Sequence, residues 1–153
     1  MVAIHIAYTA PINPPGAMPI LTHAQAWAGL ARKVKRPQDF VPAIESSEIL
    51  SEADGVVSYV AYFKPGLPLG HGQTIKGTCW LSPPCRLHYE MEDGSTSDNI
   101  ISVGPGRSGD AAPELFLTFV YGWEHPELEA GSAEAKEAEE MHTQVGLIHT
   151  EHT

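Results

Sequence analysis

The feature that most constrains the fold is the order in which segments of different periodicity follow one another. An alternating apolar segment at residues 2–7 comes first, a helical segment from Thr22 follows, and a long acidic helix begins near Ser132. Between these helices, period-two alternation and turn residues predict six strands, at residues 45–51, 56–64, 73–81, 86–92, 97–103 and 115–123. We expect one antiparallel sheet with a single apolar face, covered by the terminal helix. A curved sheet closed by one helix leaves a hollow, which in a small protein suits a small apolar molecule.

The first helix carries clear boundary signals. Thr22 and Gln25 have the spacing of a capping box, and Pro37 ends the helix. A short second turn is predicted at residues 38–41, and residues 11–19 are predicted to be a loop because they are rich in proline. The buried stripe of the helix is predicted to consist of Trp27, Leu30, Ala31 and Val34. Four basic residues at its end are predicted to form a solvated helix terminus rather than a binding patch: Arg32, Lys33, Lys35 and Arg36.

Length and charge narrow the classes of function. The 153 residues are expected to form one domain, and a formal net charge of −10 disfavours nucleic acid and anionic membrane surfaces as partners. No apolar stretch is long enough to predict a membrane-spanning helix. With no signal-peptide pattern, we expect a cytoplasmic protein whose two cysteines, Cys79 and Cys85, are reduced. Their spacing does not predict a zinc site, and no phosphate-binding or dinucleotide-binding motif is present, so the sequence predicts neither a metal nor a cofactor.

Histidines on the terminal helix are candidates for acid–base chemistry. One face of that helix carries Ala138, Met141, Val145, Ile148 and His152, and His142 and His149 flank it. His149 is the predicted catalytic acid or base, because histidine titrates near neutral pH. The alternative is that these histidines are simply hydrogen-bonded or solvated at the helix edge.

Two strands supply the other predicted catalytic residues. Leu87, Tyr89 and Met91 form a better inward-facing set than the charged residues between them, so we expect the charged residues Arg86, His88 and Glu90 to face water. Tyr89 would then be a polar group inside the hollow, and Asn99 on the next strand would lie at its wall. A buried asparagine needs a partner or a ligand, although Asn99 could equally satisfy a backbone bulge. The remaining predicted ligand-binding residues are aromatic or apolar: Tyr59, Phe63, Phe119, Tyr121, Met141, Val145 and Ile148.

Three segments give the chain a resemblance to a known family. They contain the runs LTHAQAW from residue 21, HYEMEDGSTSDNII from residue 88 and FVYGWEHP from residue 119. On these segments the chain resembles the AtaL-like family of the START-like (SRPBCC) helix-grip superfamily. The resemblance implies an α+β helix-grip fold: a seven-stranded curved antiparallel sheet wrapped around a long C-terminal helix, with two short helices between strands 1 and 2. Relatives in the superfamily bind lipids, sterols or polyketides, and some are cyclases or aromatases.

These observations favour a protein that binds a small hydrophobic molecule in an internal cavity. The leading hypothesis is a polyketide-cyclase-like enzyme of secondary metabolism, which folds its substrate and assists with acid–base chemistry. The alternative is a non-catalytic carrier that sequesters an apolar metabolite or lipid, and a third class is a protein–protein interaction module. No nucleic acid and no stable membrane insertion are expected, and a homodimer is compatible with the sequence.

Overall fold

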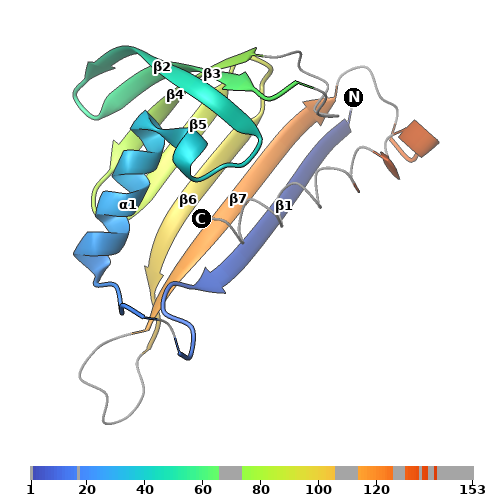
Figure 1. Ribbon diagram of the computed structural model, residues 1–153. Helices are drawn as coiled ribbons and strands as arrows, with labels where there is room; N and C mark the ends of the chain where they lie inside the picture. Colours follow the sequence, from blue (N-terminus) through green and yellow to red (C-terminus); the bar gives the residue numbers. More distant parts are fainter. Residues whose placement is uncertain are drawn as a thin grey trace.

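The described part of the chain folds into a seven-stranded sheet with a 13-residue helix packed on its concave side (Figure 1). A computed structural model describes residues 2–16, 18–65, 74–105, 114–125, 130–134, 136–137 and 140. The elements are β1 (Val2–Pro11), α1 (His23–Lys35), the short 3₁₀ helix η1 (Pro37–Asp39), β2 (Ile44–Ala53), β3 (Val56–Phe63), β4 (Thr74–Ser82), β5 (Arg86–Met91), β6 (Thr96–Val103) and β7 (Leu115–His125). All neighbouring strands are antiparallel, in the order β1-β7-β6-β5-β4-β3-β2. The prediction of an α+β fold with seven antiparallel strands is confirmed.

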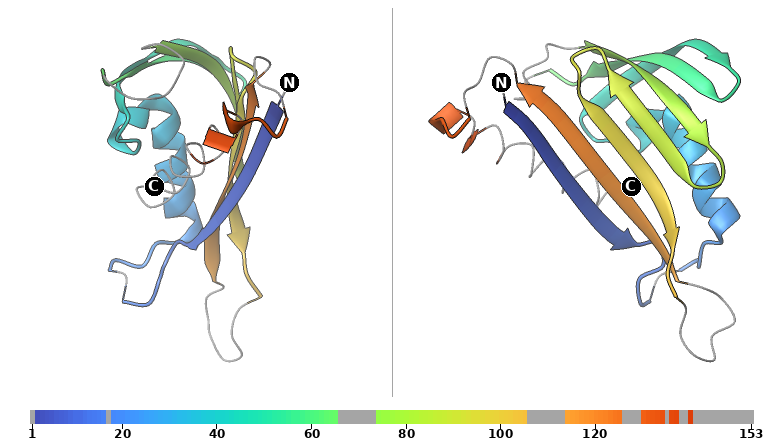
Figure 2. Two further views of the ribbon diagram at one scale, coloured as in Figure 1. Left: turned by 90° about the vertical axis from the view of Figure 1, so that its right-hand side faces the viewer. Right: turned by 180° about the vertical axis from the view of Figure 1, so that it is seen from behind.

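Curvature of the sheet creates the space that α1 occupies. β2 and β3 bend over α1 at one end of the sheet, whereas β1 and β7 form the flatter opposite end (Figures 1 and 2). A tight hairpin joins β2 to β3, in which Asp54 and Gly55 have φ angles of 53° and 75°. Positive φ at both central residues matches the twist of the flanking strands, which explains the Asp-Gly pair.

Strand β1 is longer than the sequence predicted. Residues 11–19 were expected to be loop, but β1 continues to Pro11, which pairs with Phe116. β1 lies at the edge of the sheet, where the missing N–H of a proline costs no ladder hydrogen bond. The expectation of a loop is therefore wrong for Pro11.

Helix α1 begins and ends as its sequence signals predict. Thr22 Oγ1 accepts from the backbone N–H of Gln25 at 3.2 Å, and the Thr22 N–H donates to Gln25 Oε1 at 2.9 Å. This capping box satisfies two amides that the helix itself leaves free. The short second turn, predicted at 38–41, is η1 at residues 37–39.

The hydrophobic core lies between α1 and the concave face of the sheet. Leu30 and Val34 of α1 pack against Val57, Tyr59, Ala61, Ile75, Cys79, Leu87 and Ile101. Buried and exposed side chains alternate on β5, where Leu87 is fully buried and Arg86 and Glu90 are exposed. The prediction of which side chains of this strand point inward is therefore confirmed. On the outer face, Arg86 and His88 both pair with Asp98, with closest N–O distances of 2.6 and 2.8 Å.

The predicted terminal helix is only partly covered by the described residues. Residues 133–134, 136–137 and 140 are helical, and the Lys136 N–H donates to the Ser132 carbonyl at 3.2 Å. His142, His149 and His152 lie outside the described residues, as do Met141, Val145 and Ile148.

A glycine on β4 gives Tyr59 the room that it occupies. A Cβ atom at Gly77 would lie 2.5 Å from the Tyr59 hydroxyl oxygen and 3.1 Å from the Glu90 carbonyl oxygen. We expect Gly77→Ala to lower the free energy of unfolding by about 1–3 kcal/mol, because the tyrosine ring or the strand must shift. The measurement is urea unfolding followed by tryptophan fluorescence.

Gly29 in α1 is the matched control for that substitution. A Cβ atom there would meet nothing within 4 Å, so Gly29→Ala should stabilise the protein by up to about 1 kcal/mol through helix propensity. Equal effects of the two substitutions would contradict the close approach of Tyr59 to β4.

Candidate functional site

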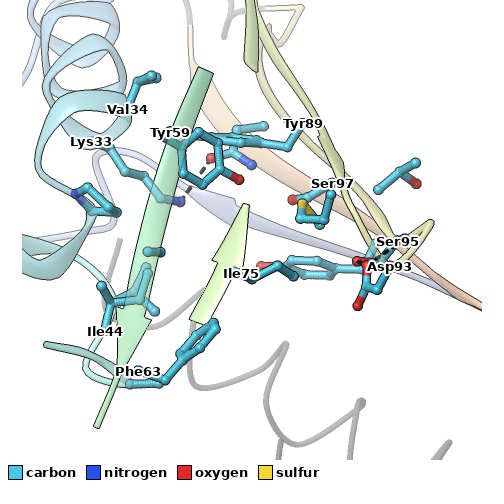
Figure 3. A pocket seen from close by; sticks show the side chains of 18 of the residues that line it. Lys33, Val34, Ile44, Tyr59, Phe63, Ile75, Tyr89, Asp93, Ser95 and Ser97 are labelled. Atoms are coloured by element: carbon cyan, nitrogen blue, oxygen red, sulfur yellow. Dashed lines mark hydrogen bonds between the residues drawn. The ribbon is translucent and has the colours of Figure 1, made fainter. Parts of the chain in front are cut away.

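A cavity of about 190 Å³ lies between the concave face of the sheet and the α1–η1 segment. Most of its wall is apolar, formed by residues of α1, η1 and strands β2 to β7 (Figure 3). The lining residues are Lys33, Val34, Pro37, Val41, Ala43, Ile44, Tyr59, Ala61, Phe63, Ile75, Tyr89, Met91, Asp93, Ser95, Thr96, Ser97, Asn99, Tyr121 and Trp123. This composition, apolar with a few polar groups, is typical of a site for a small organic ligand.

The most unusual group in the wall is the amine of Lys33. Only 3% of this residue is exposed, although it was predicted to belong to a solvated helix end. That prediction is wrong for Lys33, because Leu30, Lys33 and Val34 lie three and four residues apart and share the inner face of α1. The prediction of a solvated helix end is correct for Arg32 and Arg36, since both pair with Asp39 on the surface.

The surroundings of Lys33 are almost free of charge. Its Nζ atom donates to Asn99 Oδ1 at 2.9 Å and lies 4.6 Å from the centre of the Phe119 ring. Within the described part of the chain, Lys33 makes no ion pair with a carboxylate. Burial of the ammonium therefore lowers the pKa of Lys33 from 10.5 to about 7, and the nearby Cys79 opposes this shift.

Asn99 faces Lys33 from the middle of β6. The residue is fully buried, and its Oδ1 is held by the Lys33 amine. Its Nδ2 has no hydrogen-bond partner among the described residues. β6 pairs in regular register with β5 and β7 at this position, so the structure gives no bulge for Asn99 to satisfy. A buried amide donor without a partner is costly unless a ligand accepts its hydrogen bond.

Two tyrosine rings lie beside this pair. Tyr59 and Tyr89 make an edge-to-face contact with ring centres 6.0 Å apart. Burial raises the pKa of both phenols, to which the neighbouring Cys79 also contributes. Both hydroxyl groups therefore stay protonated at neutral pH and can donate hydrogen bonds to a ligand oxygen.

A second polar group lies away from Lys33 along the cavity wall. The backbone N–H and the hydroxyl of Ser95 donate to Asp93 Oδ1 at 2.9 and 2.5 Å. Figure 3 shows Asp93 and Ser95 on the opposite side of the cavity from Lys33. The cavity therefore has an amine at one end and a carboxylate at the other.

The structure brings most of the described candidate residues together. Tyr59, Phe63, Tyr89, Asn99 and Tyr121 line the cavity. Phe119 is fully buried beneath the Lys33 amine, and its ring stacks on Tyr121 with a centroid distance of 6.0 Å. The other four, Met141, Val145, Ile148 and His149, lie outside the described residues.

Five polar lining residues were missed by the sequence analysis: Lys33, Asp93, Ser95, Thr96 and Ser97. Lys33 could have been found from helical spacing, because it is three residues from Leu30 on the buried stripe. Asp93, Ser95 and Ser97 were assigned to a hairpin turn and its following strand, and no local pattern shows that this turn borders a cavity. Within the described ranges, no group of three His, Cys, Asp or Glu side chains could hold a metal ion, and no helix is long and apolar enough to cross a membrane.

Comparison with known proteins places the chain in a family. Residues 6–153 match the profile of AtaL, described as acetylaranotin biosynthesis cluster protein L. The chain belongs to the AtaL family. A family relative of that description from Aspergillus terreus is 32% identical over 145 residues, which cover 94% of this chain and 80% of the relative.

Solved structures share the fold of this AtaL family member at low sequence identity. The Zhui aromatase/cyclase from Streptomyces sp. R1128 aligns with a TM-score of 0.61 and 19% identity, over 97% of this chain and 87% of that one. The di-domain aromatase/cyclase StfQ of the steffimycin biosynthetic pathway aligns with a TM-score of 0.58 and 14% identity. That alignment covers 95% of this chain and 48% of StfQ, so the chain corresponds to about half of the di-domain protein.

Proposed function

We propose that residues 1–153 form a single START-like (SRPBCC) helix-grip domain that acts in the cytoplasm as a cyclase-like enzyme of secondary metabolism. Its substrate would be a small hydrophobic intermediate that carries carbonyl groups. The observation that carries this proposal is a set of buried hydrogen-bond donors in an apolar cavity wall: Lys33, Asn99 and the hydroxyls of Tyr59 and Tyr89. Membership of a family named after a biosynthesis cluster and the fold shared with two aromatase/cyclases support it.

The proposed mechanism combines shape and hydrogen bonding. The cavity holds a flexible intermediate in a folded geometry, so that the carbon atoms that react lie close together. Neutral Tyr89 and the Nδ2 of Asn99, which has no partner among the described residues, donate to the carbonyl oxygen on which negative charge develops. His149 is proposed to move the proton, as the sequence analysis suggested.

Filling the cavity tests whether it is the binding site. Ala61 on β3 is buried and lines the cavity, so Ala61→Leu should weaken the binding of 1-naphthol at least tenfold by occupying ligand space. The measurement is isothermal titration calorimetry on folded protein. Ser58→Leu places a leucine on the same strand but outside this cavity and should leave the affinity unchanged. Failure of the wild type to bind, or equal affinities of both variants and the wild type, would refute the proposed site.

Single substitutions separate an enzyme from a carrier. Tyr89→Phe removes one hydroxyl donor and His149→Ala removes the proposed proton carrier, and each should reduce kcat with a cognate substrate at least tenfold. The substrate itself can be obtained by extracting whatever co-purifies with the protein and identifying it by mass spectrometry. If that molecule returns unchanged from the wild type and both variants, the protein is a carrier instead.

A further inference from the structure

We propose that Lys33 is a nucleophilic amine that captures a ketone carbonyl of the ligand as an imine, with Asn99 holding a second ligand oxygen. This inference rests on the proposed function, because it assigns a chemical class of ligand, a 1,3-dicarbonyl compound, to the same cavity. It extends that function by adding a covalent step at a named nitrogen atom.

Placement of the amine supports a reactive role. Lys33 lines an apolar cavity, where its Nζ atom contacts a neutral amide and an aromatic ring. A structural buried lysine is ordinarily paired with a carboxylate, and no described carboxylate pairs with Lys33. Desolvation of a lysine in a hydrophobic pocket is a known way to activate it toward carbonyl groups.

Of the groups that face the amine, Cys79 raises the pKa of Lys33, but by less than burial lowers it. With a pKa of about 7, a substantial fraction of Lys33 is unprotonated at neutral pH. The pKa of Cys79 on β4 is raised to about 12 by burial, and burial also raises the pKa of Tyr59 on β3 and Tyr89 on β5. All three groups are therefore neutral where Lys33 titrates, and none supplies a counter-charge.

The amide of Asn99 suggests which carbonyl compounds fit. Because Oδ1 accepts from Lys33, the Nδ2 of the same amide lies beside the amine and remains without a partner among the described residues. Two neighbouring nitrogen atoms, one a nucleophile and one a donor, match the two oxygens of a 1,3-dicarbonyl group. The amine would attack one carbonyl carbon while Nδ2 donates to the other oxygen.

The covalent step needs no further reactant. The lone pair of neutral Nζ forms a bond to the carbonyl carbon, and the carbonyl π electrons move to oxygen. A proton passes from nitrogen to that oxygen, and the resulting carbinolamine loses water to give the imine. Transfer of a proton from the carbon between the two carbonyl positions to the imine nitrogen gives the conjugated enaminone. Amine and diketone thus become enaminone and water without oxidation or reduction.

The test uses the full chain and 1-phenyl-1,3-butanedione. The expected product is a single adduct on Lys33, heavier by one probe molecule less one water, accompanied by new near-ultraviolet absorbance of the enaminone. Peptide mapping locates the adduct, which should form on Lys33 at least tenfold faster than on Lys35, an exposed lysine of the same helix. Lys33→Met should abolish the adduct, and Lys35→Met should retain it.

A near-isosteric variant tests the role of the free amine. Asn99→Asp places a carboxylate against Lys33, which raises the pKa of the amine and keeps it protonated. Adduct formation on Lys33 should therefore fall at least tenfold relative to the wild type at the same pH. Binding of the diketone without an adduct at Lys33, or equal labelling of Lys33 and Lys35, would overturn this inference and leave the proposed function intact. Failure to bind both the diketone and 1-naphthol would refute the two together.

Discussion

Replacing Lys33 by methionine is expected to raise the free energy of unfolding at pH 7 by about 1–3 kcal/mol. Burial of the ammonium lowers the pKa of Lys33 from 10.5 to about 7, so the fold bears a cost that methionine, of similar length, does not have. Loss of the donor to Asn99 Oδ1 offsets part of the gain, by about 1 kcal/mol. Urea unfolding of both proteins at the same pH measures the difference.

The effect of Lys33→Met on the free energy of unfolding should depend on pH. Between the folded pKa of about 7 and the ordinary value of 10.5, the unfolded chain binds more protons than the folded one. Wild-type stability from this group therefore rises with pH, by about 1–2 kcal/mol between pH 7 and pH 8.5, and the Lys33→Met variant lacks that rise.

Cys79 contributes with the opposite sign, but at higher pH. Its pKa is raised by burial from 9.0 to about 12, so its contribution is lost only as the pH rises above about 9, and it is common to both proteins. A stability difference that stays constant from pH 6 to pH 8.5 would contradict the assigned environment of Lys33.

Phe119→Ala is expected to lower the free energy of unfolding by about 3–5 kcal/mol. Phe119 is fully buried on β7, the strand next to the edge strand β1, and it stacks on Tyr121 and supports the Lys33 amine. Removing the ring leaves a cavity beneath α1 and takes away the cation–π contact.

Thermal and urea unfolding measure this loss. Val103→Ala on the neighbouring strand is the control, because Val103 is 54% exposed and its truncation should cost less than about 0.5 kcal/mol. Similar losses in the two variants would contradict the full burial of the Phe119 ring.

Local patterns predicted the strands well, because alternation and turn residues are local properties of a half-buried sheet. The Asp54-Gly55 pair marks the β2–β3 hairpin, and the inward set on β5 follows from period-two alternation alone. By contrast, the pairing of β1 with β7 joins residues more than a hundred positions apart, and no local pattern specifies it. The resemblance to a known family implied a seven-stranded sheet, but it did not state which strand pairs with β1.

The candidate site was predicted less completely than the sheet. Tyr89 and Asn99 were chosen from strand parity, which depends only on period two, and both line the cavity. Lys33 was missed because four neighbouring charged residues were interpreted as one solvated group. Successive side chains of a helix point to different sides, and that of Lys33 lies on the buried side. Asp93 belongs to a turn, and its proximity to the cavity depends on sheet curvature, which a sequence pattern does not encode.

The separation of Lys33 from Asp93 along the cavity wall has a consequence for selectivity. An amine at one end and a carboxylate at the other make the cavity electrically unsymmetrical. An elongated substrate with two different ends therefore has one preferred direction of entry. Under the proposed function, ring closure would start from the same carbonyl in every turnover, so the wall of the cavity would decide which regioisomer is made.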